Sequence, residues 1–252
     1  GWVLTGVTAT GQTDEPGTRD FWYYVAYSKD ECGNISAVSN VSDGTLNYHL
    51  GDVSTGSADC AGENIVDIGD ISLLGAHYGT AEPDPLYLAC LDVGPTTDYS
   101  VDARPTTDNR VQFEDLMMFA INFGAVSLVG DGNAVALETP VLSLQSGSAS
   151  PGEVSATLVL SGNEASTKGV HALVGFDPAQ LELVDVAPGP LGTGQVFFKT
   201  LPDAQGVTVD LAQLGTGAAL PGSGVIATLR FRQIGAEGAP TLLAADLRDI
   251  HN

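Results

Sequence analysis

Basic residues are scarce in this chain of 252 residues, and their scarcity narrows the choice of partners. Only 9 lysines and arginines stand against 31 aspartates and glutamates, which gives a formal net charge of -22. Nucleic acid and anionic membrane surfaces would be repelled, so we exclude both as partners and expect cations instead. No apolar run reaches the roughly 18 residues of a membrane span, and the sequence therefore predicts no membrane insertion.

Cysteine is equally rare, since the chain contains three. Three cysteines are too few for a disulfide scaffold. Cys60 lies inside one acidic segment, and Cys90 stands two residues before Asp92, which opens a second one. We expect a Cys60–Cys90 disulfide that ties the two segments together, the alternative being two unpaired, buried thiols. Cys32 then either packs as an apolar side chain or pairs with a segment outside this chain.

Catalytic patterns are missing as well. None of the four histidines pairs with a cysteine or a carboxylate in the spacing of a metal site or a catalytic triad. No pair of carboxylates is set in a recognisable apolar pocket, so the sequence gives no support for a glycosidase. We therefore expect that the chain is not an enzyme.

Against these absences stands a repeat of one acidic pattern, 45 residues apart, at Asn64–Gly79 and Asn109–Gly124. Each copy places an oxygen-bearing side chain, two spacer residues and an aspartate before an apolar run, and a further aspartate lies upstream. A loop of oxygens closed by a carboxylate at the head of a helix suits calcium, which takes about six to eight oxygen ligands. The pattern predicts two calcium ions, with ligands Asp52, Asp67 and Asp70 in the first loop and Asp92, Gln112 and Asp115 in the second.

A short helix is expected after each of these loops. Residues 71–78 and 116–123 place apolar side chains at i, i+3 and i+7, and each run stops at a glycine, which is the expected helix end. Helices of this length are not stable alone. We therefore expect the two helices to pack on each other.

Residues 1–48 show two strand patterns. Residues 21–27 alternate as a strand does, residues 30–34 form a turn, and residues 35–41 form a second strand. This combination resembles the last two strands of a fibronectin type III domain, which implies the C-terminal part of such a β-sandwich. The sequons at Asn34 and Asn40 are possible glycosylation sites in a secreted protein.

Residues 49–125 resemble a dockerin, a small duplicated calcium module of cellulosome-type assemblies. The resemblance rests on Gly51-Asp52-Val53, Val66–Leu74, Asp92-Val93 and Val111–Phe119. Both loops carry insertions after the first ligand. In the loop positions that the resemblance supplies, Glu63 and Asp108 stand at the fifth, and Ile65 and Arg110 at the seventh, whose backbone carbonyl binds the ion. The Ser-Thr pair by which many dockerins meet their partner is absent, because Ile68-Gly69 and Phe113-Glu114 occupy those positions.

From residue 138 to residue 252 the pattern is all β, after a linker at residues 126–137. Alternating apolar residues between glycine and proline turns describe a two-sheet sandwich. The segments Gly175–Gly189 and Gly222–Arg232 resemble a cohesin, the sandwich that receives dockerins, whose last strand would be missing here. The alternation runs through Val154, Ala156, Leu158 and Leu160, through Val170, Ala172, Val174 and Phe176, through Val207, Val209 and Leu211, and through Val225, Ala227, Leu229 and Phe231.

Together these patterns predict a mainly β chain: a partial fibronectin III-like sandwich, a small α duplicated calcium-loop module and a cohesin-like β-sandwich. We expect an extracellular or cell-surface, non-catalytic scaffold or adhesion protein, stabilised by two calcium ions. Its partners would be protein modules of the cohesin and dockerin type or neighbouring subunits of the same protein. Two alternatives stay open. The chain is a subunit of an extracellular filament whose subunits complete each other's sheets, or an ancillary region of a polysaccharide-degrading enzyme.

Overall fold

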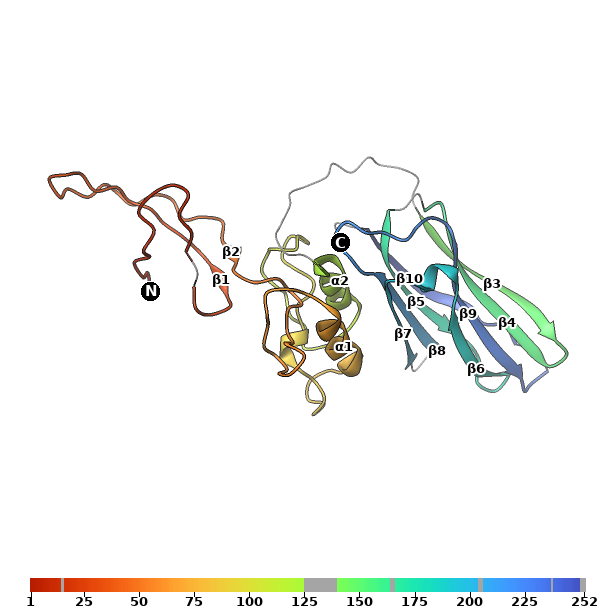
Figure 1. Cartoon of the computed structure of the whole chain (residues 1–252). Coiled ribbons are helices and arrows are strands. Elements are labelled where there is room, and N and C mark those ends of the chain that lie inside the picture. The colour runs from red at the N-terminus through yellow and green to blue at the C-terminus, as the bar shows by residue number, and fades with distance from the viewer. Residues whose placement is uncertain (15, 125–139, 164–165, 204–205, 237, 250–252) are drawn as a thin grey trace.

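The computed structural model describes the chain except for residues 15, 125–139, 164–165, 204–205, 237 and 250–252. The linker predicted at 126–137 lies outside the described residues. Figure 1 shows three parts in chain order: an extended N-terminal segment (residues 1–49), a helical module (residues 50–124) and a β-sandwich (residues 140–249). No helix in these described parts is long and apolar enough to cross a membrane. The structure is mainly β, as predicted.

The sandwich consists of two antiparallel four-stranded sheets. The first sheet has the order β10-β5-β8-β7, and the second has the order β3-β4-β9-β6. Alternate residues of each strand face inward and form one apolar core between the sheets, in which Leu158, Val209 and Leu229 are fully buried. The strands are β3 (Val141–Ser150), β4 (Glu153–Ser161), β5 (Thr167–Gly175), β6 (Leu181–Pro188), β7 (Val196–Asp203), β8 (Gly206–Gln213), β9 (Gly224–Gln233) and β10 (Thr241–Asp249), with a 3-10 turn η2 (Pro190–Gly192) after β6.

The alternation predicted for β9 breaks at one place. Leu158 pairs with Ala227, but Val159 pairs with Val225, so Ile226 is an additional residue in the ladder. Such a bulge shifts the face on which side chains lie. Ile226 and Ala227 are both fully buried as a result, so the alternation predicted through Val225 and Ala227 does not hold at this point.

The helical module contains α1 (Ile68–His77), α2 (Phe113–Asn122) and a 3-10 turn η1 (Ala89–Leu91). Both helices begin three residues earlier than predicted, because Asp67 and Gln112 are the N-cap residues and the following aspartates lie in the first turn. The glycine that follows each helix bonds to the segment that precedes the other helix. The N–H of Gly79 donates to the carbonyl of Val111, and the N–H of Gly124 donates to that of Val66, both at 2.8 Å.

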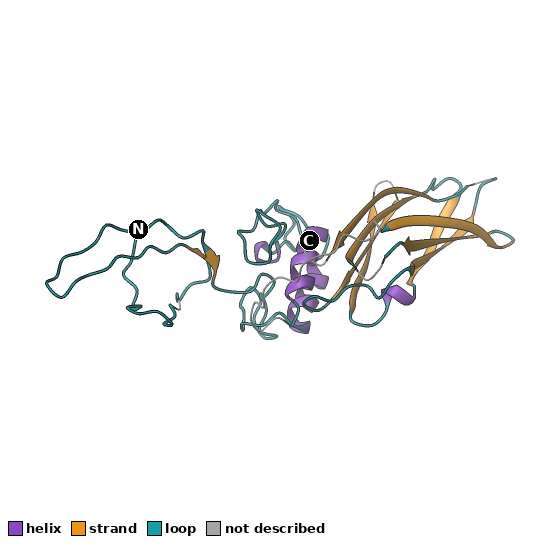
Figure 2. Cartoon of the chain, turned by 90° about the horizontal axis from the view of Figure 1, so that it is seen from above, coloured by secondary structure: helices purple, strands orange, loops and turns teal. Residues whose placement is uncertain are grey.

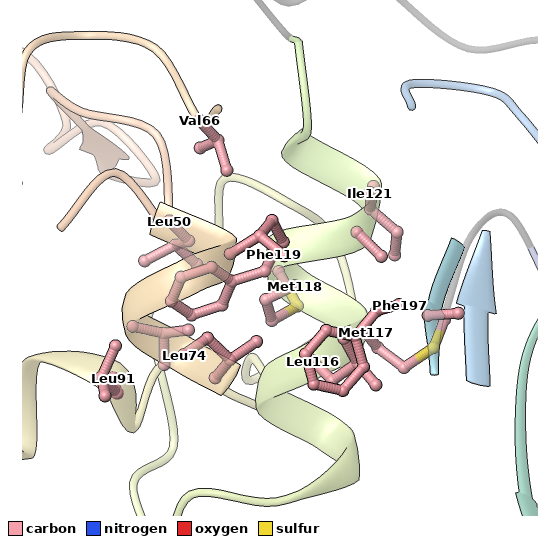
Figure 3. Packing of buried hydrophobic residues seen from close by; sticks show 14 of the residues in the cluster. Leu50, Val66, Leu74, Leu91, Leu116, Met117, Met118, Phe119, Ile121 and Phe197 are labelled. Atoms are coloured by element: carbon pink, nitrogen blue, oxygen red, sulfur yellow. The ribbon is translucent and has the colours of Figure 1, made fainter. Parts of the chain in front are cut away.

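An apolar cluster fills the space between the two helices and the loops. Figure 3 shows Leu74 of α1 and Phe119 of α2 meeting Leu50 and Leu91 of the two loops. All four side chains are fully buried. The expectation that the helices pack on each other is thus met, and the loops contribute to the same core.

The N-terminal segment is a ribbon with few regular pairs. Its strands β1 (Phe21–Trp22) and β2 (Thr45–Leu46) are two residues long, so the longer strands predicted at 21–27 and 35–41 were wrong. These two stretches still lie antiparallel. The backbone N–H groups of Ser36, Ser39 and Ser42 donate to the backbone carbonyls of Ser28, Ala26 and Tyr24, respectively. Most of the segment is exposed. A ribbon without a packed face has little to enforce regular pairing.

Phe119 gives a test of the module's core. We expect Phe119→Ala to lower the free energy of unfolding by about 3–5 kcal/mol, because a fully buried ring leaves a cavity. Chemical denaturation of the purified chain measures the loss. Ile68→Ala is the control, since Ile68 on α1 is 65% exposed, and an equal loss in both variants would contradict the packing described.

Candidate functional site

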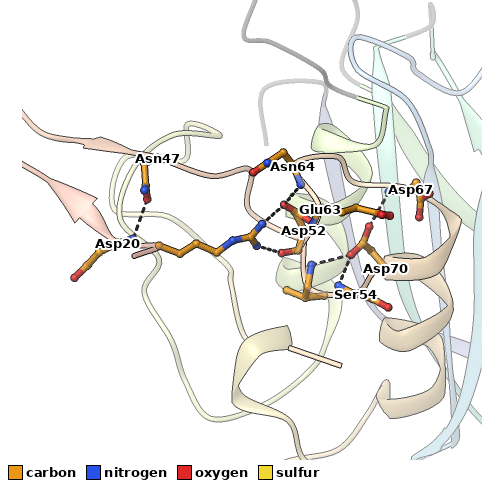
Figure 4. A network of polar contacts seen from close by, with 10 residues as sticks. Asp20, Asn47, Asp52, Ser54, Glu63, Asn64, Asp67 and Asp70 are labelled. Carbon is orange, nitrogen blue, oxygen red and sulfur yellow. Dashed lines mark hydrogen bonds and ion pairs between the residues drawn. The ribbon is translucent and has the colours of Figure 1, made fainter. Parts of the chain in front are cut away.

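The first acidic loop is built around Asp52 and Asp70. The Asp52 carboxylate accepts hydrogen bonds from the backbone N–H groups of Glu63 and Asn64, each at 2.8 Å. Asp70, in the first turn of α1, accepts from the N–H groups of Val53, Ser54 and Asp67 at 2.7–2.8 Å (Figure 4). The loop therefore wraps around two carboxylates that are fully buried.

The second loop repeats this bonding pattern. Asp92 accepts from the N–H groups of Asp108 and Asn109, as Asp52 does in the first loop. The acceptor role of Asp70 falls to Asp115, in the first turn of α2, whose partners are the N–H groups of Val93, Gly94 and Gln112 at 2.8–2.9 Å. The repeat in the sequence is thus also a repeat of hydrogen bonds. In this bonding pattern Asp92 corresponds to Asp52, and Asp115 corresponds to Asp70.

Burial makes these carboxylates costly as anions. Desolvation raises the pKa of Asp70, opposed by its backbone N–H donors and reinforced by the charge of Asp52. Desolvation raises the pKa of Asp115 to about 8, and the charge of Asp92 acts in the same direction. Each loop therefore holds two carboxylates whose negative charges oppose each other. A divalent cation between them would remove that conflict.

The donor set fits calcium better than a transition metal. Carboxylate and carbonyl oxygens are the ligands of hard cations. No cluster of three or more His, Cys, Asp or Glu gathers as a metal set in the described residues, so carbonyls, amides and water would complete the coordination around each pair. Asp52 with Asp70, and Asp92 with Asp115, are the residues that would hold the ions, and an ion would neutralise the charge of each pair.

The other predicted ligands lie at the loop margins. Asp67 Oδ1 accepts the N–H of Gly69 and caps α1. The Gln112 amide donates to Asp108 and Glu114, and Asp108 also accepts the N–H of Arg110. Glu63 is exposed, and Ile65 is half-buried beside it. Their part in metal binding stays a prediction.

The structure joins Cys60 to Cys90 with a disulfide. The bond connects the first loop to η1, which precedes Asp92. The two acidic loops are thereby held together on one side of the helices. Cys32 is a free, exposed thiol in the N-terminal segment. The sequon residues Asn34 and Asn40 are exposed in the same segment, and Asn34 donates to Asp30.

Two functional contacts at the loops were missed by the sequence analysis. The Arg19 guanidinium donates to the carboxylate and the backbone carbonyl of Asp52. The Tyr87 hydroxyl donates to Asp92 at 2.9 Å, and burial together with Asp92 raises the pKa of Tyr87 to about 12. Arg19 lies 33 residues before Asp52. No local sequence pattern predicts a contact between residues so far apart in the chain.

The helices face the first sheet of the sandwich, with the loops on their far side (Figure 2). Phe197, Ala212 and Leu214 of this sheet region belong to the apolar cluster of the helical module. The Phe197 ring lies 5.3 Å from that of Tyr78. Gly169 of β5 leaves room for Met117 of α2, because a Cβ there would collide with the Met117 sulfur. The apolar cluster of the module thus extends onto the outer face of the first sheet, beside the separate core between the two sheets.

The sandwich also satisfies the free carbonyls at the helix ends. The last carbonyls of any α-helix lack partners within the helix. The Lys199 ammonium donates to the carbonyl of Gly75 in α1 at 2.9 Å. At α2, the N–H groups of Gly215 and Thr216 donate to the carbonyls of Ala120 and Phe123. The sheet region therefore receives the C-terminal ends of both helices, while the acidic loops hold their N-terminal ends.

A buried polar group completes the interface. Asp210 of β8 accepts from the Tyr78 hydroxyl at 2.9 Å and from Nδ1 of His171 at 2.6 Å. The bond to Asp210 raises the pKa of His171, against the opposing effect of burial, and Asp246 and Glu114 act in the same direction. Burial, followed by Asp210, raises the pKa of Tyr78 well above its usual value. The His171 ring also lies 5.5 Å from the Phe113 ring of α2.

Lys168 holds the segment that follows β8 by hydrogen bonds to its backbone. Its fully buried ammonium donates to the carbonyls of Gly215 and Ala218 at 2.7 and 2.9 Å. Burial lowers the pKa of Lys168 to about 8. The lysine thus holds in place the same loop whose N–H groups bind the end of α2.

Comparisons with known proteins give likenesses of structure. No family model matches the chain, and no curated protein matches it. The sixth cohesin of scaffoldin B from Acetivibrio cellulolyticus, solved in complex with a Cel5 dockerin, is similar at 21% identity, with a TM-score of 0.39 over 45% of this chain and 88% of that one. A non-cellulosomal cohesin from Archaeoglobus fulgidus is similar at 18% identity, with a TM-score of 0.36 over 45% and 80%. A cohesin from Clostridium acetobutylicum shows 19% identity, with a TM-score of 0.36 over 42% and 75%.

Asp115→Asn tests the second loop. We expect calcium to stabilise the natural chain by about 2.7 kcal/mol for each site at a hundredfold excess over Kd, and the variant to lose one site's share. Calorimetric melting in calcium and in chelator measures the difference. Asp43→Asn, at an exposed position of the N-terminal segment, is the control. An Asp115→Asn chain that responds to chelator as strongly as the control would refute this assignment.

His171 predicts a pH dependence of the interface. A histidine whose folded pKa is raised contributes stability that is complete below its unfolded pKa of about 6.5 and is lost as pH rises through the folded value. We expect the N–H of Gly215, which bonds across the interface, to lose protection against hydrogen exchange over that range, after correction for intrinsic rates. His171→Gln should remove the dependence and His49→Gln should keep it. The same pH profile in both variants would contradict the assignment.

Proposed function

We propose that the chain is an extracellular, non-catalytic assembly or adhesion protein, in which a helical module stiffened by two calcium ions docks on a β-sandwich. The observation that carries this proposal is the apolar cluster to which both parts contribute side chains. Tyr78 and Met117 of the helices meet Phe197 and Gly169 of the sheet without a solvent layer between them. Such an interface is built from helix residues that would otherwise expose a large apolar face.

The polar contacts support docking of a defined geometry. The carbonyls at both helix ends find donors on the sandwich, and Asp210 takes a donor from each side, Tyr78 from the module and His171 from the sandwich. Buried polar groups that are all paired fix one orientation and penalise others. The resemblances of the two sequence regions to a dockerin and a cohesin predict the same kind of pairing.

Calcium would act on this interface through the helices. The carboxylates of each loop sit at the N-terminal end of a ten-residue helix, whose other end meets the sandwich. Helices of this length depend on contacts outside themselves. An ion that holds Asp70 and Asp115 in place therefore also holds the face that docks. The partner class is a protein surface, and the chain's role is to connect modules.

A cut within residues 125–139 tests the docking in the folded chain. With a specific protease site placed there, we expect the two fragments to stay together on gel filtration in calcium. We expect them to separate in chelator, because the docking contacts are non-covalent and the helices that make them would lose the ions that hold them. Gly169→Leu should separate them even in calcium, since its side chain takes the space of Met117. Gly147→Leu is the matched control, because Gly147 is an exposed position of β3 in the opposite sheet, with open space around a Cβ. Separation of the natural fragments in calcium would refute docking.

A further inference from the structure

Arg19 brings a positive charge into the first acidic loop. Its guanidinium donates to the Asp52 carboxylate and to the Asp52 backbone carbonyl, so it holds the residue by two different oxygens. The Asp52 side chain is fully buried, whereas that of Arg19 is 34% exposed. The chain has only 9 basic residues against 31 acidic ones, so a positive charge at this loop is an uncommon feature.

The position of the guanidinium is prepared by its neighbours. Gly62 faces it, and a Cβ at that position would collide with the guanidinium atoms. The ring of Tyr48 lies 5.3 Å from the Arg19 Cζ atom on another side. Asn47 holds the adjoining chain. Its oxygen accepts the N–H of Asp20 (Figure 4), and its amide donates to the carbonyls of Pro16 and Thr18.

Among the residues that the structure describes, no cation takes the corresponding place in the second loop. Asp92 accepts from the neutral Tyr87 hydroxyl at the place where Asp52 accepts from Arg19. Within the described parts of the chain, no ion pair forms at Asp92 or Asp115. Arg104 of the second loop lies over the Phe21 ring instead, 5.0 Å from its centre. The two loops therefore agree in their backbone bonds and differ in their charge.

We propose that Arg19 is an internal cation of the first loop, which calcium must displace there, whereas calcium enters the second loop without such competition. This inference rests on the calcium binding of the proposed function. Two positive charges beside one buried carboxylate repel each other, and calcium needs the Asp52 carboxylate that the guanidinium holds. The loops then differ in affinity, and filling of the first loop releases Arg19 and its segment.

Displacement links calcium to the N-terminal segment. Trp22 follows Arg19 closely, and its indole N–H donates to the carbonyl of Thr18 at 3.3 Å. Release of Arg19 frees the strand end that carries this bond. The indole N–H of Trp22 therefore reports the position of the segment, while the amides of Gly62 and Gly94 report the first and the second loop.

The experiment is a calcium titration of the full chain, followed by NMR at these three N–H groups. In the natural chain we expect Gly94 to respond at lower calcium than Gly62, and Trp22 to shift together with Gly62. Arg19→Gln should raise the affinity of the first loop about three- to tenfold, the range for loss of one partly exposed, charge-assisted pair. It should leave Gly94 unchanged and uncouple Trp22 from calcium. Arg19→Lys should give a smaller gain.

Arg104→Gln is the matched control, because it removes another arginine at the N-terminal segment without touching Asp52. The inference is overturned if Arg19→Gln leaves the Gly62 midpoint unchanged or moves it to higher calcium, since Arg19 would then not compete. It is also overturned if Arg104→Gln reproduces the gain. If neither loop of any variant responds to calcium, the calcium part of the proposed function fails as well, and that result differs from a failure confined to Arg19.

Discussion

The structure depends on a bond between buried aspartates and backbone N–H groups at the heads of two short helices. Asp70 and Asp115 each gather three N–H groups, two from the start of the loop and one from the helix cap. A carboxylate in the first turn also complements the helix dipole. Without these bonds each loop would lose its closure, and a ten-residue helix would lose its fixed beginning. The cost is a desolvated negative charge, and this cost makes each loop receptive to a cation.

The opposite ends of the helices depend on the sandwich. Lys199 and the N–H groups of Gly215 and Thr216 bind carbonyls that the helices cannot satisfy themselves. The two short helices are therefore held at one end by the loops and at the other by the sheet region. Stiffness at one end is transmitted to the other, since a helix is a rigid element over this length. On the proposed function, docking and cation binding would for this reason depend on each other.

The elements with a regular apolar period could be predicted from the sequence. Strands β4, β5, β8 and β9 of the sandwich follow from alternation, and the helices follow from the apolar spacing after each acidic loop. Helix starts were predicted too late, because the closing aspartates looked like loop residues and are in fact first-turn residues. The bulge at Ile226 breaks a pattern that sequence alone presents as regular. The contacts of Arg19 with Asp52 and of Asp210 with Tyr78 join residues distant in the chain, and their geometry is set by packing that no local pattern encodes.

The placement of basic residues shows how an acidic chain is held together. Arg19 joins the N-terminal segment to the first loop, Lys199 joins the sandwich to α1, and Lys168 fixes the segment that receives α2. Each binds a backbone carbonyl, so each connects to the chain at points that no side-chain substitution in the partner removes. A fixed cation in a strongly negative protein also lowers the repulsion between neighbouring parts. Arg19 differs from the two lysines, because its partner is also a carboxylate of a candidate ion site. On our proposal calcium opposes this contact, whereas the contacts of Lys168 and Lys199 involve no loop carboxylate.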